Sequence, residues 1–180
     1  MNIYRGIVLG ISGLLALFLT ILFVVRGTSM FPAAAALAWA VLAYICIDLG
    51  FIDRFFDVLP ADVRTWRGMS EVSLAATLAL FLFTYLNLNR WNDHLSYGAI
   101  AWVMTLAGLA ALGLYDPALA AGIARLSIAA TAVFGSVLIA YLSWRGFDRA
   151  IMLVPAWALL IAWIIAGYMT ISGKVDNDII

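Results

Sequence analysis

The sequence predicts an all-α protein, a polytopic bundle of transmembrane helices, and three observations support this fold class. Of its 180 residues, 66% are hydrophobic and 11% are charged, whereas a soluble domain carries about 25% charged residues. The charges are segregated and leave six uncharged stretches of roughly 18 to 24 residues, enough for a helix to cross about 30 Å of hydrocarbon. No segment alternates apolar and polar residues as the strands of a membrane β-barrel do. An ordinary soluble enzyme is therefore excluded.

The uncharged stretches predict six helices in order. The first follows Arg5. Its apolar segment is too long for a signal peptide, and no cleavage site follows it. The second contains the run Ala33 to Ala36, which allows neighbouring backbones to approach closely, and Cys46, which as a lone cysteine indicates no disulfide framework. The third to sixth are uncharged stretches between polar turns. The expected bounds are residues 6–25, 30–52, 69–89, 95–115, 122–144 and 149–173.

The connections between these helices are short, with one exception. Tight turns force successive helices to run antiparallel, which predicts a single transmembrane bundle over residues 1–180. The exception is the loop at residues 53–67, which mixes aromatic residues with both signs of charge. Such a composition suits a short interfacial helix or a cap over the bundle.

Charge alone does not orient the bundle. We call side A the membrane face that holds the N-terminus, the 53–67 loop and the turn at Asp116, and side B the opposite face. Side A holds six of the basic residues against four on side B, but it also holds eight of the ten acidic residues. The count of basic residues favours a cytoplasmic side A, whereas net charge favours a cytoplasmic side B. Acidic residues contribute little to orientation, so both topologies stay open.

Tryptophans fall both at the predicted interfaces and inside the predicted helices. Those at the interfaces are Trp66, Trp91 and Trp144, where the amphipathic ring favours the headgroup region. Trp39, Trp102 and Trp157 each lie about two turns from side B. They would either line a pocket at one depth or, as the simpler interpretation has it, fill gaps between helices.

Familiar cofactor and catalytic sites find no support in the sequence. The one lysine, Lys174, lies at a helix end, so a retinal Schiff base in mid-helix is not expected. The one histidine, His94, lies in a turn, which leaves no paired axial ligands for haem. No zinc-ligand spacing, G-x-S-x-G motif or phosphate-binding glycine loop is present. We therefore expect no enzymatic activity, no cofactor and no metal site, and nucleic acid is not an expected partner.

Ionisable residues just inside side A are the candidate ligand-binding residues: Asp48, Asp53, Glu71 and Arg125. Charges at membrane depth are costly unless they are paired or wet, so they are default functional candidates. The alternative is structural, because Asp48 or Glu71 paired with Arg125 would clamp three helices together. All four residues lie within about one turn of an interface, where long side chains reach water easily.

The turn between the fifth and sixth helices contains Arg145, Gly146 and Arg149. Gly146 is free to take a positive φ, and the two arginines would meet lipid phosphates or a partner. The order of this segment is distinctive: Arg-Gly, then Arg-Ala, an apolar start, Ala-Trp and a further apolar turn that ends in a glycine. It resembles the turn and sixth helix of the membrane domain in bacterial seven-transmembrane receptors with diverse intracellular signalling modules (7TMR-DISM).

The resemblance extends over most of the chain. Tyr4 and Gly6 open the first helix, Arg26 lies in the first turn, Gly50 ends the second helix, and the run FLFTYLNL precedes the polar exit of the third. The resemblance implies a bacterial inner-membrane sensor with the N-terminus, side A and the 53–67 loop in the periplasm. It also implies a seventh helix, which would begin just where this sequence stops at Ile180, so that the sequence reads as a fragment or as a six-helix relative. A cytoplasmic output module such as a diguanylate cyclase, histidine kinase or phosphatase, within a dimer, is implied as well.

Two other functions stay open at this point. A small transporter or channel component would need a polar site at mid-depth, and the sequence places nothing more polar there than serine or threonine. A structural subunit of a larger membrane complex would need only packing surfaces. Under the sensor hypothesis the side A charges and the 53–67 loop receive a periplasmic ligand or partner.

Overall fold

The computed structural model describes residues 3–26, 30–51, 60–88 and 93–171, and within these ranges every regular element is an α-helix. This confirms the predicted all-α class. The helices are α1 (Ile3–Arg26), α2 (Met30–Asp48), α4 (Pro60–Leu86), α5 (Asp93–Tyr115), α6 (Pro117–Trp144) and α7 (Asp148–Ile171). Of these, α1, α2, α4, α5 and α6 are long and apolar enough to cross a membrane. The chain is thus a multi-pass membrane protein, and the sixth crossing, by α7, stays a prediction.

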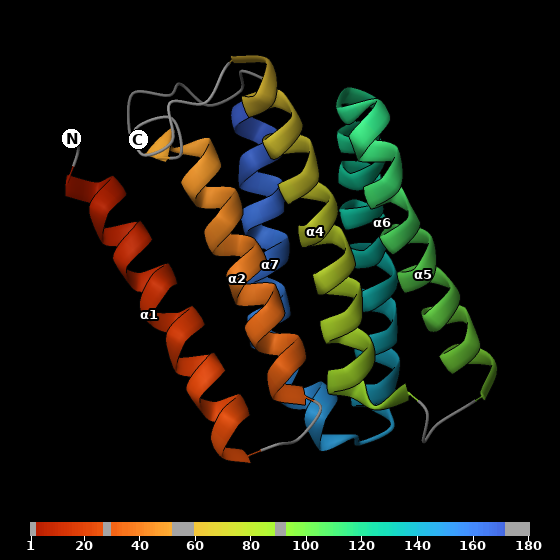
Figure 1. Ribbon diagram of the computed structural model, residues 1–180. Coiled ribbons are helices and arrows are strands. Elements are labelled where there is room, and N and C mark those ends of the chain that lie inside the picture. Colours follow the sequence, from red (N-terminus) through yellow and green to blue (C-terminus); the bar gives the residue numbers. More distant parts are fainter. Residues whose placement is uncertain (1–2, 27–29, 52–59, 89–92, 172–180) are drawn as a thin grey trace. The chain divides into compact units, whose positions relative to one another are not determined.

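The described helices belong to two compact units, of residues 1–131 and 132–180. In the first unit, α1 packs on α2, α2 on α4 and α4 on α5, so the helices lie side by side in chain order (Figure 1). This unit also contains the first half of α6. The second unit contains the rest of α6 and α7. The single bundle expected over residues 1–180 stays a prediction.

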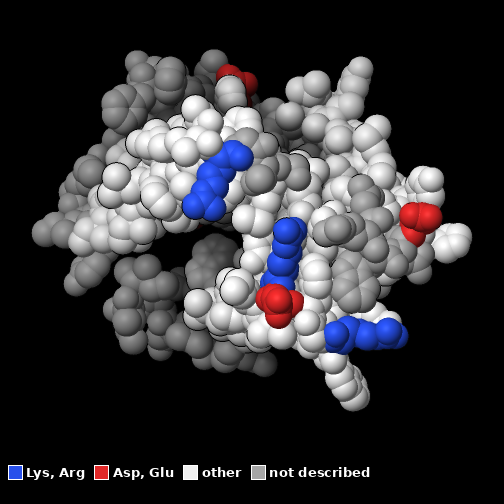
Figure 2. All heavy atoms as spheres, turned by 90° about the horizontal axis from the view of Figure 1, so that it is seen from below, with Lys and Arg blue, Asp and Glu red and all other residues white. Residues whose placement is uncertain are grey.

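Large apolar side chains cover much of the described surface, as expected for a protein whose solvent is lipid. On α1, for example, Leu14 is 70% exposed and Val24 is 76% exposed. Charged side chains are few in the end view of Figure 2, where most of the described atoms belong to uncharged residues. Exposed leucine and valine on this scale would promote aggregation in water, but in hydrocarbon they cost nothing.

Two helix ends differ from the sequence-based expectation near the long loop. Helix α2 ends at Asp48 and not at residue 52, because Gly50 takes a φ of 67° and the amide N–H groups of Leu49 and Gly50 close the last turn. Helix α4 begins at Pro60 and not at residue 69. Residues 60–67, expected to be loop, form its first two turns, since proline suits the first helical position and Asp62 favours the first turn. Residues 52–59 lie outside the described ranges.

The start of α6 also lies earlier than expected, at Pro117 and not at residue 122. The Asp116 carboxylate accepts hydrogen bonds from the amide N–H groups of Ala118 and Leu119, both at 3.1 Å. Asp116 is therefore an N-cap, and Pro117 occupies the first helical position, where a missing N–H is harmless.

The turn between α6 and α7 shows the glycine conformation that the sequence predicted. Gly146 has a φ of 75°. Its N–H donates to the Ser143 carbonyl and the N–H of Phe147 donates to the Leu142 carbonyl, at 2.9 and 3.0 Å. These two bonds form a Schellman motif, in which the residue after the helix adopts the left-handed conformation.

The core of the first unit is built from small and branched residues on α4, α5 and α6. Close packing of small residues takes the place of the hydrophobic effect between helices that are surrounded by lipid. On α2 the buried residues are mostly alanines: Ala33 and Ala40 on one face, and Ala35 and Ala38 roughly opposite at 100° per residue. The core cluster consists of Val72, Ala75, Ala79, Leu106, Leu109, Ala120 and Ala124.

Candidate functional site

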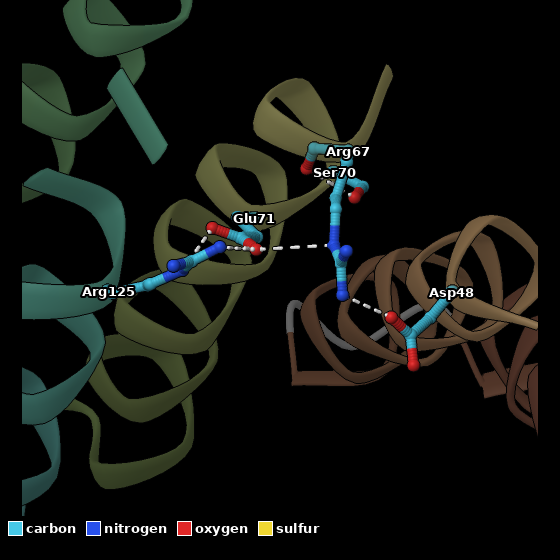
Figure 3. Close-up of polar contacts among 5 residues, drawn as sticks. All are labelled: Asp48, Arg67, Ser70, Glu71 and Arg125. Carbon is cyan, nitrogen blue, oxygen red and sulfur yellow. Dashed lines mark hydrogen bonds and ion pairs between the residues drawn. The ribbon is translucent and has the colours of Figure 1, made fainter. Parts of the chain in front are cut away.

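A chain of four charged side chains crosses three helices at side A, and we call it the charge ladder. Its members are Asp48 at the end of α2, Arg67 and Glu71 on α4, and Arg125 on α6 (Figure 3). All four lie in the first compact unit. Their formal charges alternate along the chain and sum to zero.

Glu71 is the buried centre of the charge ladder, with a side chain only 5% exposed. Its two carboxylate oxygens accept hydrogen bonds from Nε and Nη2 of Arg125, each at 2.8 Å. This bidentate arrangement is the strongest geometry that an arginine and a carboxylate can adopt. It compensates much of the cost of removing Glu71 from water.

Arg67 continues the charge ladder from Glu71 to α2. Its Nε lies 4.0 Å from Oε1 of Glu71, one helical turn further along α4, and its Nη2 donates to Oδ1 of Asp48. Arg67 and Asp48 have side chains 50% and 42% exposed, so water screens this second ion pair far more than the first. The hydroxyl of Ser70 donates to the Arg67 carbonyl at 2.8 Å within the same helix.

Close backbone packing fixes α4 where Glu71 meets Arg125. A Cβ atom built on Gly68 would lie 2.7 Å from the Pro117 carbonyl oxygen, at the start of α6. A Cβ atom on Gly113, near the end of α5, would lie 2.8 Å from the sulfur of Met69. Both glycines therefore allow α4 to approach the α5–α6 turn closely, which holds the buried end of the charge ladder in place.

The structure brings together three of the four candidate ligand-binding residues predicted from the sequence. Asp48, Glu71 and Arg125 belong to the charge ladder, and Glu71 pairs with Arg125 as the clamp alternative anticipated. Asp53 lies outside the described residues. Sequence reasoning missed Arg67, which had been assigned to the loop. Its spacing of four residues from Glu71 was the available signal, because such residues share a helix face.

The predicted partner-contact residues Arg145 and Arg149 lie at the α6–α7 junction, and both are exposed. The guanidinium of Arg145 lies over the ring of Tyr141, 5.2 Å from its centroid. Such a cation–π contact orients the arginine but leaves its N–H donors free to meet an anion. Arg149 lies in the first turn of α7, beside Asp148.

The chemistry available at the charge ladder is ionic recognition. Across residues 3–26, 30–51, 60–88 and 93–171, no group of three or more His, Cys, Asp and Glu side chains could hold a metal ion. Arg125 has five N–H donors, of which Glu71 takes two, and its side chain is 65% exposed. An anionic group that reaches Arg125 would compete with Glu71 for the guanidinium, and a cation would compete with Arg67 for Asp48.

Comparison with known proteins gives one match. The profile of a protein family described as 7TM diverse intracellular signalling matches residues 1–180. No curated protein and no solved structure matches the chain.

Proposed function

The chain belongs to the 7TM diverse intracellular signalling family, and on that basis we propose that it relays a periplasmic or membrane signal to a cytoplasmic output module. The family match supports a transmembrane sensor domain. In our proposal the output module is of the diguanylate cyclase or histidine kinase type and normally belongs to the same polypeptide. The bundle itself performs no catalysis and works within a homodimer.

The charge ladder is the observation that carries the proposal. It joins three helices through ion pairs of unequal strength, one buried and bidentate, the other half exposed. A ligand shifts a conformational equilibrium only by its differential affinity for the two states. A charged ligand that displaces a member of the charge ladder has such a difference, because it binds only where the internal pair is open.

The proposed topology places side A, with the N-terminus and the charge ladder, in the periplasm of a bacterial inner membrane. Side B then faces the cytoplasm with the exposed Arg145 and Arg149 at the α6–α7 junction. Anionic lipids on the cytoplasmic leaflet attract basic residues beside the membrane. This orientation follows from the family resemblance; it agrees with the net charge of the two sides and runs against the count of basic residues, six on side A and four on side B.

A fusion measures signal relay directly. Six crossings return the chain to side A, so the chain is joined after Ile180 through a seventh apolar helix of about 20 residues to a diguanylate cyclase domain, which then lies in the cytoplasm. Cyclic-di-GMP is measured in cells that contain equal amounts of membrane-inserted protein. We expect Glu71→Gln to change the output several-fold, because it weakens the buried pair. Asp62→Asn, which alters an exposed acid on the same helix, is the matched control and leaves the output unchanged.

Two results would count against the sensor. Equal output from the wild type, Glu71→Gln and Asp48→Asn would show that the charge ladder does not affect relay. Substrate flux into liposomes through the isolated bundle would indicate a transporter in its place.

A further inference from the structure

An apolar hollow of about 230 Å³ lies between α1 and α2 in the first unit, and Phe81 of α4 also lines it. Ala34 and Ala38, one turn apart on α2, contribute small side chains where larger residues would fill the space. Leu15 of α1 lines the hollow and is 54% exposed, so the hollow reaches the helix surface that meets lipid. An apolar cavity of about 150 Å³ already admits benzene, so this hollow has room for several methylene groups.

The hollow is preformed, because contacts beside it set the spacing of α1 and α2. Trp39 of α2 donates its indole N–H to the Thr20 hydroxyl of α1 at 3.0 Å, and these two residues follow the lining residues Ala38 and Leu19 in the sequence. The Thr20 hydroxyl in turn donates to the carbonyl of Ala16, a fully buried residue, at 2.7 Å. In hydrocarbon no water replaces a lost hydrogen bond, so the two helices keep this spacing whether or not the hollow is occupied.

The hollow lies in the half of the membrane next to side B. On α2 its lining residues begin at Ala34 and end at Val41, four and eleven residues after Met30, where the helix begins at side B. At 1.5 Å per residue these positions lie about 6 and 17 Å from that end, and each leaflet supplies about 15 Å of hydrocarbon. The acyl chains of the side B leaflet therefore reach the depth of the hollow.

The face of α1 that lines the hollow leads to a positive charge at side B. Ser12, Leu15 and Leu19 line the hollow, and Arg26, the last residue of α1, follows Leu19 by seven residues. At about 100° per residue all four positions fall within a sector of about 60°. Arg26 thus lies on the same face of α1, about 10 Å nearer to side B. It is exposed, and no ion pair joins it to another of the described residues.

The chain and the headgroup of a lipid would contribute differently at this place. An acyl chain that moves from the bilayer into the hollow gains little hydrophobic free energy, since lipid tails are as apolar as leucine. It does restore the dispersion contacts that an empty cavity forfeits, but any acyl chain supplies these. Selection among lipids therefore depends on Arg26, because a guanidinium binds phosphate strongly and attracts anionic lipids.

We propose that the hollow binds one acyl chain of an anionic phospholipid from the side B leaflet, and that Arg26 holds the phosphate of this lipid. A helix from a second copy of the chain is about 10 Å across and too wide for the hollow, whereas a flexible run of methylene groups fits it. The site requires neither an orientation of the bundle nor the relay of a signal. It therefore stands or fails independently of the proposed function.

Photolabelling in nanodiscs tests the lipid site. The unaltered chain is placed in phosphatidylcholine nanodiscs with a small fraction of a probe lipid that carries a diazirine near the middle of one acyl chain. The probe is either phosphatidylglycerol, which is anionic, or phosphatidylcholine, and mass spectrometry of the peptides then maps the labelled residues. We expect phosphatidylglycerol to label residues 12–19 and 34–41 several-fold more than phosphatidylcholine does.

Four variants separate the headgroup from the acyl chain. Arg26→Gln should lower the labelling by phosphatidylglycerol about fivefold, the effect of losing the attraction of one basic residue to anionic lipid. Arg149→Gln removes the same charge from side B as the matched control and should leave this labelling unchanged. Ala34→Leu fills the hollow and should also lower the labelling. Ala43→Leu enlarges an exposed alanine of α2 outside the lining and should not.

Three results would overturn the lipid site. Equal labelling by the two probe lipids would show that the hollow holds bulk lipid without selection of a headgroup. Equal losses in Arg26→Gln and Arg149→Gln would show only a general attraction of anionic lipid to side B. Labelling of neither segment by either lipid would show that another occupant, such as a second copy of the chain, covers the hollow. The comparison of the two lipids uses the unaltered chain, so it decides the question even if Ala34→Leu fails to fold.

Discussion

At the scale of single residues, the members of the charge ladder differ in burial and in hydrogen bonding, so their substitutions should differ in energetic cost. Glu71 is nearly buried and bonded at both oxygens, whereas Asp48 meets water and Arg67 serves both carboxylates. Removing a partner from a buried pair leaves an uncompensated charge and costs more than removing the pair. The order of the effects is therefore fixed by burial, not by the number of ion pairs each residue makes.

We expect Arg125→Ala to lower the free energy of unfolding by about 3 kcal/mol, because it leaves the Glu71 carboxylate buried without its bidentate partner. The Arg67 guanidinium, 4.0 Å from that carboxylate, compensates only part of the loss. Glu71→Gln should cost about 2 kcal/mol, since the exposed Arg125 is rehydrated. Asp48→Asn should cost less than about 1 kcal/mol. Unfolding in mixed micelles by increasing SDS measures all three, and an equal loss for Asp48→Asn and Arg125→Ala would contradict the burial argument.

The sequence was enough to predict most members of the charge ladder, but not which of them form ion pairs with one another. Asp48, Glu71 and Arg125 were recognisable because charges next to apolar helices are conspicuous. The pairing of Glu71 with Arg125 joins residues 54 apart in the chain, and only the packing of α4 on α6 decides it. Similarly, the sequence places Trp39, Trp102 and Trp157 at one depth. Their indole N–H groups donate to the hydroxyls of Thr20, Thr131 and Ser136, and these partners depend on helix rotation, which an all-apolar helix does not reveal.

At the scale of the helix, Gly68 sets how closely α4 approaches α6. We expect Gly68→Ala to lower the free energy of unfolding by about 1–3 kcal/mol, because the new methyl group meets the Pro117 carbonyl, a backbone atom that cannot swing away. Gly98→Ala on α5 is the matched control. A Cβ there meets nothing within 4 Å, and alanine favours a helix by up to about 1 kcal/mol. The same SDS titration should show opposite signs for the two variants.

The N-cap of α6 offers a second test at this scale. Replacing Asp116 with alanine removes the acceptor for two amide N–H groups and should cost about 1 kcal/mol. Asp116→Asn keeps a side-chain oxygen and should lose only a few tenths of that value. Amide hydrogen exchange of Ala118 and Leu119 should accelerate in Asp116→Ala alone. Unchanged exchange at these two amides would show that the cap does not protect the first turn.

Helix existence was predictable here, and so was the start of α2 at Met30, but the starts of α4 and α6 were not. Uncharged stretches identify spans, but charges do not end helices. The charges of Arg64 and Arg67 predict a loop, although Pro60 and Asp62 form an ordinary helix start in the preceding turns. For the same reason, the segment after Asp116 was treated as a connection, even though Asp-Pro is an N-cap followed by a favourable first helical residue.

At the scale of the whole molecule, the proposed topology predicts which helix ends face the periplasm. Asp93 and Tyr115 lie at opposite ends of α5, and both are exposed. In a Cys46→Ala background, a thiol reagent that cannot cross the inner membrane should label Tyr115→Cys in cells with a permeable outer membrane. It should label Asp93→Cys only after cell lysis. The reverse pattern would place side A in the cytoplasm and contradict the proposed input side.

Membership of a signalling family was suggested by loose motifs such as Arg145-Gly146 and Arg149-Ala150, and the match over residues 1–180 confirms it. Orientation was a different problem. It depends on a difference between the basic residues of the two sides, and six against four is too small a difference to decide. The sequence therefore identified the solvent and the family, but left the direction of insertion to experiment.

The spacing of the charge ladder along the chain has a consequence for synthesis in the membrane. Helices enter the bilayer in chain order, so Glu71 arrives on α4 before Arg125 exists on α6. Arg67, one turn away on the same helix, is then the cation available to accompany the Glu71 carboxylate into lipid. We expect Arg67→Ala to reduce the yield of inserted protein more than it reduces the stability of the molecules that do fold. Arg67 would thus stabilise the Glu71 carboxylate during insertion, before Arg125 has been synthesised.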